Sequence, residues 1–158
     1  MDRSRFLFLE VHGGDRQIAI ELESIFRVLA SRGETNAAGT MTRLFIYGTL
    51  KRGHGRAGLL ADQHYLGEVR TRPQYRMVRV DQYPGLLHDE AGVAVEGELW
   101  DVQEDCLAEL DLVEAVDAGL YRREAIELEA DGQQQPVESY FYLHPVEGLE
   151  DCGRCWTG

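Results

Sequence analysis

Leu44-Phe-Ile-Tyr-Gly-Thr-Leu-Lys-Arg-Gly53 is the stretch of this sequence that decides the fold. Its first four residues form a run of apolar and aromatic side chains, which is typical of a buried strand. Gly48 then permits backbone angles that other residues adopt at a cost, and its missing side chain lets a ligand approach the main chain. We therefore expect a buried strand that runs into a glycine-containing loop.

Two interpretations of the loop over residues 47–53 follow from its composition. Successive N–H groups in such a turn can form a nest that binds a carboxylate or a phosphate, and Thr49 adds a hydroxyl. A phosphate-binding P-loop is excluded, because the pattern GxxxxGK[ST] is absent. The other interpretation is a tight turn in which Tyr47 is packed only for its shape.

The composition sets the broad class of the protein. The chain has 158 residues, of which 44% are hydrophobic and 28% charged, and this fits one globular domain with a core of its own. A net charge of −12 repels a phosphate backbone, so we expect no nucleic-acid partner. No apolar stretch approaches the roughly 20 residues that a membrane span needs, and the first ten residues lack the pattern of a signal peptide. We expect a soluble, cytoplasmic, monomeric protein without a membrane partner.

Residues 1–40 differ in composition from the rest of the chain. The run Ile18–Leu29 has apolar residues at the spacing of a short amphipathic helix, and a hairpin across His12-Gly-Gly-Asp15 is the alternative interpretation. Small and polar residues follow, as in a linker, and Met41 opens the first strong strand. Our hypothesis is that residues 1–40 are a poorly ordered or non-native N-terminal extension, and that residues 41–158 form the domain.

Strands dominate this domain. Apolar runs or apolar–polar alternation predict strands over residues 44–47, 65–69, 75–80, 93–100, 121–128 and 136–143. Leucines at a spacing of three predict a helix over residues 103–114, and Asp131-Gly132 predicts a turn. The expected fold class is α/β of the α+β kind, a compact domain whose largely antiparallel sheet curls toward a small barrel.

The three cysteines are too few for a disulfide framework. Cys152 and Cys155 have the CxxC spacing of a zinc site, but the chain has no second pair to complete four ligands. His144 is a conceivable third ligand. We expect no metal, and two free thiols in a loose C-terminal tail.

Glu114 is an acid in an unexpected position. It follows Leu107 by seven residues and Leu110 by four, which are helical spacings, so it shares their apolar face. The helix has other acids that can occupy its solvated face: Glu104, Asp105, Glu109 and Asp111. Glu114 can pair with a cation such as Arg122 or Arg123, or it can sit in a pocket with a raised pKa. Alternatively, the helix frays and the side chain turns to water.

Two motifs in order resemble the gamma-glutamylcyclotransferase-like proteins, which include the gamma-glutamylamine cyclotransferases. The first is the stretch 44–53 quoted above. The second is Leu110-Asp-Leu-Val-Glu-Ala-Val-Asp-Ala-Gly-Leu-Tyr-Arg-Arg123, in which a glutamate ends a helix and a tyrosine begins the next strand. Tyr83-Pro84-Gly85 is similar to a segment that this family has between the two motifs. The resemblance covers about residues 42 to 148.

The resemblance implies an enzyme that acts on a small γ-glutamyl compound. The substrate's α-amine attacks its own γ-carbonyl, so that 5-oxoproline forms and the attached amine leaves. Glu114 corresponds to the family's proton acceptor and donor, and crowding with Asp117 would raise its pKa further. The residues that would hold the glutamyl group, chiefly by its α-carboxylate, are Tyr47, Gly48, Thr49 and Leu50, with Tyr121 lining the pocket. The resemblance implies no cofactor.

Two other classes of function stay open at this point. The chain could be a non-catalytic binding or regulatory protein that uses the same pocket for a γ-glutamyl or carboxylate ligand. It could also be an interaction domain in which both motifs serve only the core and the turns. The presence of Glu114, and a cavity that joins the loop to it, would favour the enzyme over the binding protein. A filled apolar centre would favour the interaction domain.

Overall fold

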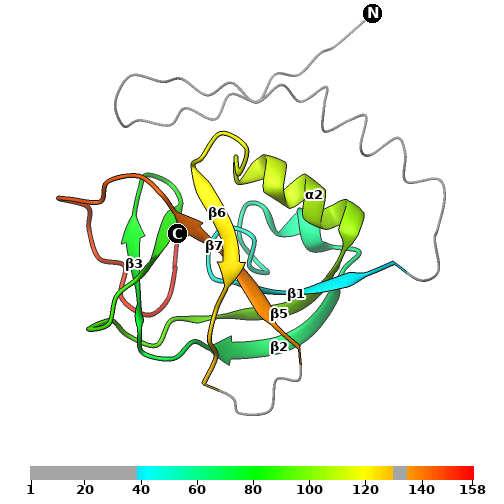
Figure 1. Ribbon diagram of the computed structural model, residues 1–158, viewed down its shortest axis with the longest axis horizontal. Helices are drawn as coiled ribbons and strands as arrows, with labels where there is room; N and C mark the ends of the chain where they lie inside the picture. Colours follow the sequence, from blue (N-terminus) through cyan, green and yellow to red (C-terminus); the bar gives the residue numbers. More distant parts are fainter. Residues whose placement is uncertain (1–38, 130–134) are drawn as a thin grey trace, which may run out of the picture. The chain divides into compact units, whose positions relative to one another are not determined.

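A computed structural model of the chain describes residues 39–129 and 135–158. The compact unit Thr40–Gly158 contains the following elements (Figure 1): β1 (Met41–Ile46), η1, a 3-10 helix (Ala57–Leu60), β2 (His64–Arg70), β3 (Tyr75–Arg79), β4 (Pro84–His88), β5 (Glu96–Gln103), α2 (Glu104–Val113), β6 (Tyr121–Ala125) and β7 (Val137–Tyr142). The helix-or-hairpin prediction within residues 1–40 and the predicted turn at residues 131–132 lie outside the described residues. The fold class is mixed α+β, as predicted.

β1 is the central strand of a five-stranded sheet with the order β2-β5-β1-β7-β6. It pairs antiparallel with β5 along its whole length and parallel with β7 at Arg43 and Leu44. Leu44, Phe45 and Ile46 are buried in succession, because both faces of the central strand are covered. The buried strand expected from the sequence is confirmed. Its loop therefore starts at the middle of the sheet and not at an edge.

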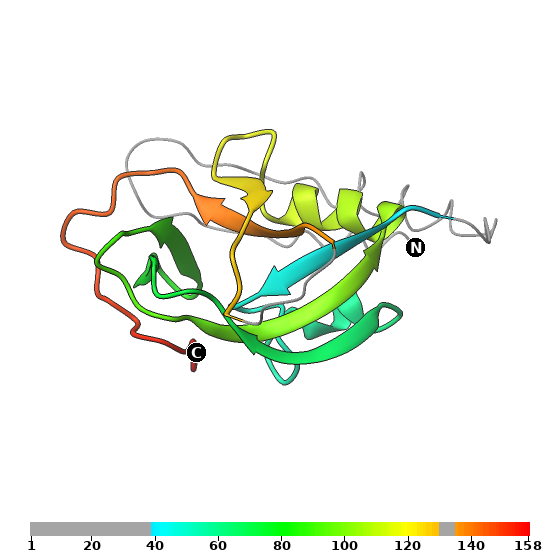
Figure 2. The ribbon, with the colours of Figure 1, turned by 60° about the horizontal axis from the view of Figure 1, so that its bottom comes forward.

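The sheet curls without closing. The other pairs, β2 with β5 and β6 with β7, are antiparallel, so the sheet is largely antiparallel as predicted. β2 and β6 are its two edges, yet the chain just beyond them meets in a bridge between Thr71 and Leu128. The N–H of Arg72 donates to the carbonyl of Glu127 at 3.0 Å beside this bridge. The edge strands β2 and β6 do not pair with each other, so the sheet stays open (Figure 2).

A second sheet consists of β3 and β4, which pair antiparallel. The sequence did not predict β4, because Pro84 and Gly85 are typical of turns. Pro84 is the first residue of the strand, a position where proline's missing N–H removes no hydrogen bond between the paired strands. Gly85 packs so closely against Tyr142 of β7 that a Cβ would lie 2.8 Å from the Cβ of that tyrosine. This contact fixes β4 beside β7.

The predicted helix over residues 103–114 is confirmed as α2, which packs against β1, β5 and η1 (Figure 1). One detail was wrong. Glu109 was expected on the solvated face, but only 2% of it is exposed. The acids at Glu104 and Asp105 are exposed, and they lie at the helix N-terminus, where negative charge is favourable.

Two strands differ from their predicted bounds for identifiable reasons. β5 runs over residues 96–103 instead of 93–100, because its register follows β1 from Ile46 opposite Glu98 to Met41 opposite Gln103. β6 ends at Ala125 instead of residue 128, where the chain turns to meet the end of β2. The remaining predicted strands agree with β2, β3 and β7 within one residue at each end, and with β1 except that β1 begins three residues earlier, at Met41.

The prediction of a loose C-terminal tail was wrong. Trp156 is 2% exposed and belongs to the main hydrophobic core. The N–H of Cys152 donates to the carbonyl of Met77 at 2.8 Å, and the N–H of Glu96 donates to the carbonyl of Arg154 at 2.7 Å. The tail is therefore fastened between β3 and β5. Its cysteines are free thiols, as predicted.

Candidate functional site

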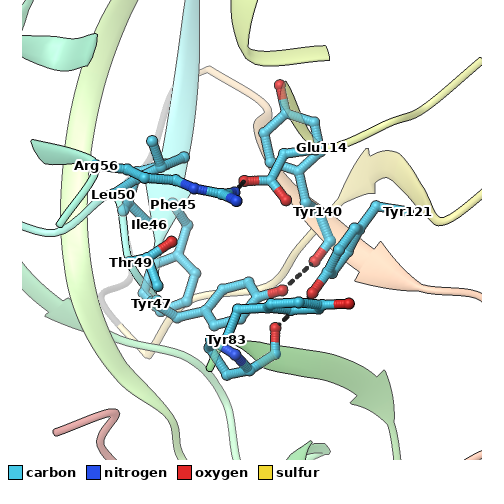
Figure 3. Close-up of a pocket in the computed structure, with 12 residues that line it drawn as sticks. Phe45, Ile46, Tyr47, Thr49, Leu50, Arg56, Tyr83, Glu114, Tyr121 and Tyr140 are labelled. Atoms are coloured by element: carbon cyan, nitrogen blue, oxygen red, sulfur yellow. Dashed lines mark hydrogen bonds and ion pairs between the residues drawn. The ribbon is translucent and has the colours of Figure 1, made fainter. Parts of the chain in front are cut away.

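A pocket lies where the end of β1, the start of β4, the end of α2 and the first residues of β6 meet (Figure 3). Its empty space, together with the open solvent at its mouth, is about 350 Å³. All of the site residues that the sequence predicted line it: Tyr47, Gly48, Thr49, Leu50, Glu114 and Tyr121. The two motifs, distant in the sequence, thus meet in one cavity.

The loop after β1 is a compact turn with free donors. The N–H of Lys51 donates to the carbonyl of Gly48 at 3.1 Å, and the N–H of Arg56 donates to the carbonyl of Thr49 at 3.0 Å. Among the described residues, no hydrogen-bond acceptor is recorded for the N–H groups of Gly48, Thr49 and Leu50. Backbone N–H groups with no other acceptor can bind an anion or a developing negative charge.

One of the two reasons predicted for glycine at position 48, unusual backbone angles, is wrong. The backbone of Gly48 is not among the described glycines with a positive φ, so it needs no unusual angles. Space is the constraint instead, because a Cβ at this position would lie 2.7 Å from Cγ of Pro84. Gly48 therefore lets the loop and β4 approach each other and close one side of the pocket.

Two contacts outside the pocket hold the loop in place. The N–H of Arg52 donates to the buried carboxylate of Glu98 on β5 at 3.1 Å, and Nε1 of Trp100 donates to the same oxygen at 3.1 Å. Nζ of Lys51 donates to the carbonyl of Trp156 at 2.9 Å. The loop is thus anchored to the sheet on one side and to the C-terminal segment on the other.

Glu114 is positioned by the way in which α2 ends. The next residue, Ala115, has a φ of 51°, a left-handed conformation that usually requires glycine. The N–H of Val116 donates to the carbonyl of Asp111 at 3.0 Å, and that of Ala115 to the carbonyl of Leu112 at 3.1 Å. These bonds form a Schellman motif, which stops the helix directly after Glu114. The predicted alternative of a frayed helix end is therefore wrong, and the side chain faces the pocket.

Burial dominates the electrostatics of Glu114. Only 11% of its side chain is exposed, and desolvation raises the pKa of its carboxyl to about 7. Nη1 of Arg56, 4.0 Å from Oε1 of Glu114, partly opposes this shift. A carboxyl with a pKa near neutral can take up and give back a proton at physiological pH.

Two details that the sequence suggested were wrong: the cation beside Glu114, and a further contribution of Asp117 to its raised pKa. Arg122 pairs with Glu124, and Arg123 donates to Asp111, so neither is the cation beside Glu114. Asp117, which was expected to crowd the site, is exposed and is not among the causes of the raised pKa.

Tyrosines form much of the remaining wall. The hydroxyl of Tyr47 donates to the carbonyl of Tyr140 at 2.7 Å, and that of Tyr121 donates to the carbonyl of Pro84 at 2.6 Å. The hydroxyl of Tyr83 is buried and, within the described part of the chain, has no hydrogen-bond partner. Burial raises the pKa of Tyr83 to about 12, so it stays a neutral donor. An unpaired buried hydroxyl on a pocket wall indicates a place for a polar ligand atom.

Sequence reasoning did not assign three lining residues of this pocket that carry polar side-chain groups: Arg56, Tyr83 and Tyr140. It also did not assign the apolar lining residues Phe45, Ile46 and Pro84. Tyr83 had a signal, because the segment Tyr83-Pro84-Gly85 stood out without a role. Arg56 had none, since an arginine in a glycine-rich loop is usually solvated. Tyr140 follows the alternation of a strand and resembles any core residue.

Other kinds of site find less support. Over residues 39–129 and 135–158, no three His, Cys, Asp or Glu side chains are grouped so that they could hold a metal ion. A second, wider groove contains Arg52, Arg70, Glu96 and Glu98, but these residues form ion pairs with one another. No helix in the described part of the chain is long and apolar enough to cross a membrane.

Comparisons with known proteins point to one family. Residues 44–157 match the family model described as gamma-glutamyl cyclotransferase, AIG2-like. A protein of Vibrio cholerae, provisionally named as a gamma-glutamylcyclotransferase, is 39% identical over 84 residues, which cover 53% of this chain and 70% of that protein. The gamma-glutamylcyclotransferase family protein YtfP of Escherichia coli is 30% identical over 68% of this chain and 88% of its own length. The crystal structure of an AIG2-like protein from Mus musculus, 27% identical, superposes with a TM-score of 0.56 and covers 66% of this chain and 77% of that one.

Proposed function

Because the chain belongs to the AIG2-like gamma-glutamyl cyclotransferase family, we propose that it converts a γ-glutamyl amine or amide into 5-oxoproline and a free amine. The observation that carries this proposal is that the Glu114 carboxylate and the loop of residues 47–50 line the same pocket. A nucleophile that belongs to the substrate itself makes a covalent enzyme intermediate unnecessary. The reaction needs only a proton carrier, a binding site that bends the substrate, and donors for a developing oxyanion.

Glu114 supplies the proton transfers in this mechanism. Its carboxylate takes a proton from the α-ammonium group, and the free amine attacks the γ-carbonyl carbon. A C–N bond forms in the five-membered ring, and the C–N bond to the leaving amine breaks as Glu114 returns the proton to that nitrogen. The attacking nitrogen then loses its second proton to the same carboxylate, which passes it to the released amine, so that 5-oxoproline and an ammonium ion leave. A pKa of about 7 supports both steps, because the acid and base forms are then nearly equal in population.

The loop supplies the binding contacts. The N–H groups of Gly48, Thr49 and Leu50 support a role in holding the glutamyl moiety, through its carboxylate or its carbonyl oxygen. Tyr121 lies on the opposite wall with its hydroxyl already bonded to Pro84, so in the proposal it shapes the pocket and takes no part in proton transfer. Holding the substrate in a curled conformation contributes a large part of the rate gain in an intramolecular reaction.

The test is an assay of the purified protein with γ-glutamyl amines and γ-glutamyl amino acids, in which mass spectrometry follows 5-oxoproline. We expect product with the native chain, and a loss of at least about 10²-fold in kcat for Glu114→Gln, as for removal of a general base. Glu90→Gln, an exposed carboxylate, is the matched control and should retain full activity. Activity that survives Glu114→Gln would refute the role of this residue.

The assay also addresses the alternative of a non-catalytic binding protein. If no member of a broad substrate panel gives product while 5-oxoproline or a γ-glutamyl compound still binds, the pocket serves binding alone. The provisional names of the relatives do not decide between binding and catalysis. The position of Glu114 in the pocket favours catalysis.

A further inference from the structure

Arg56 and Glu114 are the only charged residues among the described residues that line the pocket. Their side chains point toward each other from opposite walls, with Nη1 of Arg56 4.0 Å from Oε1 of Glu114 (Figure 3). This is a loose ion pair, because a direct charge-assisted hydrogen bond is about 2.7–2.9 Å long. The pair is also the natural counterpart of a zwitterion, which carries a cation and an anion side by side.

An α-amino acid has that arrangement of charges. Its ammonium and carboxylate groups are attached to one carbon, so whatever group binds the first fixes the position of the second within a few ångströms. If the α-amine of a γ-glutamyl substrate lies at Glu114, its α-carboxylate comes within reach of a cation a short distance away. The guanidinium of Arg56 is that cation, and its planar fork matches the two oxygens of a carboxylate.

We propose that Arg56 is a specificity residue that pairs with the α-carboxylate of the substrate and thereby presents the α-amine to Glu114. This inference rests on the proposed function. It adds that the two charged groups of the glutamyl moiety bind two different residues. The N–H groups of the loop then share the second carboxylate oxygen or bind the γ-carbonyl oxygen.

The neighbouring cations of the loop are already engaged elsewhere. Nζ of Lys51 donates to the carbonyl of Trp156, and Nε of Arg52 donates to Glu98 at 3.3 Å. Arg56 is instead held by its backbone, whose N–H donates to the carbonyl of Thr49. This bond fixes the Cα of Arg56 beside the binding loop while its guanidinium stays free to exchange Glu114 for a substrate carboxylate.

A second role for Arg56 must be distinguished from the first. Its charge stabilises the ionised form of Glu114, so it could act on catalysis only through the proton affinity of that carboxyl. The two roles differ in one respect. A residue that only tunes Glu114 affects all substrates equally, whereas a residue that binds the α-carboxylate affects only substrates that possess one.

The experiment therefore compares two substrates and four proteins. One substrate is a γ-glutamyl amine with a free α-carboxylate, and the other is the same compound with that carboxylate converted to a primary amide. Both can cyclise, since both keep the α-amine and the γ-amide. The proteins are the native chain, Arg56→Gln, Arg56→Lys and the control Arg70→Gln, which removes an exposed arginine from a similarly loose pair with Glu96.

We expect Arg56→Gln to lower kcat/KM for the carboxylate substrate by roughly 10- to 150-fold, the range for a hydrogen bond to a charged group. For the α-amide substrate the loss should be less than about threefold, and Arg56→Lys should restore part of the preference for the carboxylate. Arg70→Gln should resemble the native chain with both substrates. Equal losses with both substrates would overturn the inference and leave Arg56 as a residue that tunes Glu114.

A binding measurement keeps the inference separate from the proposed function. Calorimetry compares 5-oxoproline with 5-oxoprolinamide as ligands of the native chain and of Arg56→Gln. If the native chain forms no product but binds 5-oxoproline more tightly than the amide, and only when Arg56 is present, the catalytic proposal fails and the role of Arg56 stands. If the native chain does not distinguish the two ligands, the inference is wrong whatever the catalytic result.

Discussion

The backbone N–H of Arg52 donates a 3.1 Å hydrogen bond to the carboxylate of Glu98, which is only 6% exposed on the central part of the sheet. A single buried acid therefore fixes the far end of the loop that lines the pocket. Trp100 donates to the same oxygen, so the carboxylate joins the loop and the sheet in one small network. Such a contact is structural in itself, yet the geometry of the site depends on it.

Replacement of Glu98 by alanine should destabilise the protein. The change leaves the N–H of Arg52 and the indole N–H of Trp100 without their acceptor, at a cost of about 1–3 kcal/mol in the free energy of unfolding. Urea denaturation would measure this loss. Glu90→Ala removes an exposed carboxylate and should change the free energy of unfolding by less than about 0.5 kcal/mol. Equal effects of the two substitutions would show that the network contributes nothing.

Glu114 should make the stability of the protein depend on pH in an unusual direction. Its pKa is raised from 4.5 to about 7 in the folded state, so its stabilising contribution is complete below pH 4.5 and is lost as the pH rises through 7. Between pH 5 and pH 8 the native chain should lose about 2–3 kcal/mol relative to Glu114→Gln. Urea denaturation of both proteins at the two pH values measures this difference, and parallel pH dependences would contradict it.

Tyr83→Phe should separate stability from function. The variant removes a hydroxyl that has no partner among the described residues, so the free energy of unfolding should stay the same or rise by up to about 1 kcal/mol. Tyr121→Phe removes a hydroxyl that donates to Pro84, and it should cost about 1 kcal/mol. Thermal unfolding of the two variants provides the comparison. If the Tyr83 hydroxyl binds the substrate, Tyr83→Phe should also reduce kcat/KM by about 10-fold. A loss of stability in Tyr83→Phe as large as that in Tyr121→Phe would contradict the absence of a hydrogen-bond partner for the Tyr83 hydroxyl.

Gly48→Ala should disturb the pocket by steric contact alone. The new Cβ would lie 2.7 Å from Cγ of Pro84, so the loop or β4 must move, at a cost of about 1–3 kcal/mol in the free energy of unfolding. Gly55→Ala in the same loop is the matched control, because a Cβ there meets nothing within 4 Å. Denaturation curves that coincide for the two variants would mean that the loop yields without cost.

The sequence predicted the parts of this molecule that depend on local pattern. Leu44 to Tyr47 reads as a buried strand because every side chain in it is apolar or aromatic, and α2 follows from leucines at helical spacing. Glu114 stood out because it continues an apolar face. In each case the sequence pattern lies within a few residues of the feature that it predicts, so tertiary contacts did not change the local structural preference.

The features that the sequence did not predict depend on distant contacts. Arg56 is a pocket residue only because the fold brings the end of α2 to face it, and Glu109 is buried by packing that its charge does not reveal. Gly48 was marked as special for its backbone angles and for ligand access, but its close contact with Pro84 on another strand was not visible in the sequence. Trp156 in the tail belongs to the core for the same kind of reason.

The parallel pairing of β1 with β7 has a consequence for how the pocket forms in time. β1 opens the described domain and β7 is its last strand, so their pairing closes a loop that contains most of the domain. The closing of so long a loop costs conformational entropy before stabilising contacts have formed. Such topologies fold slowly, on the order of milliseconds to seconds. The pocket should therefore be absent from the folding transition state. A ligand that binds only the finished pocket would slow unfolding and leave the rate of folding unchanged.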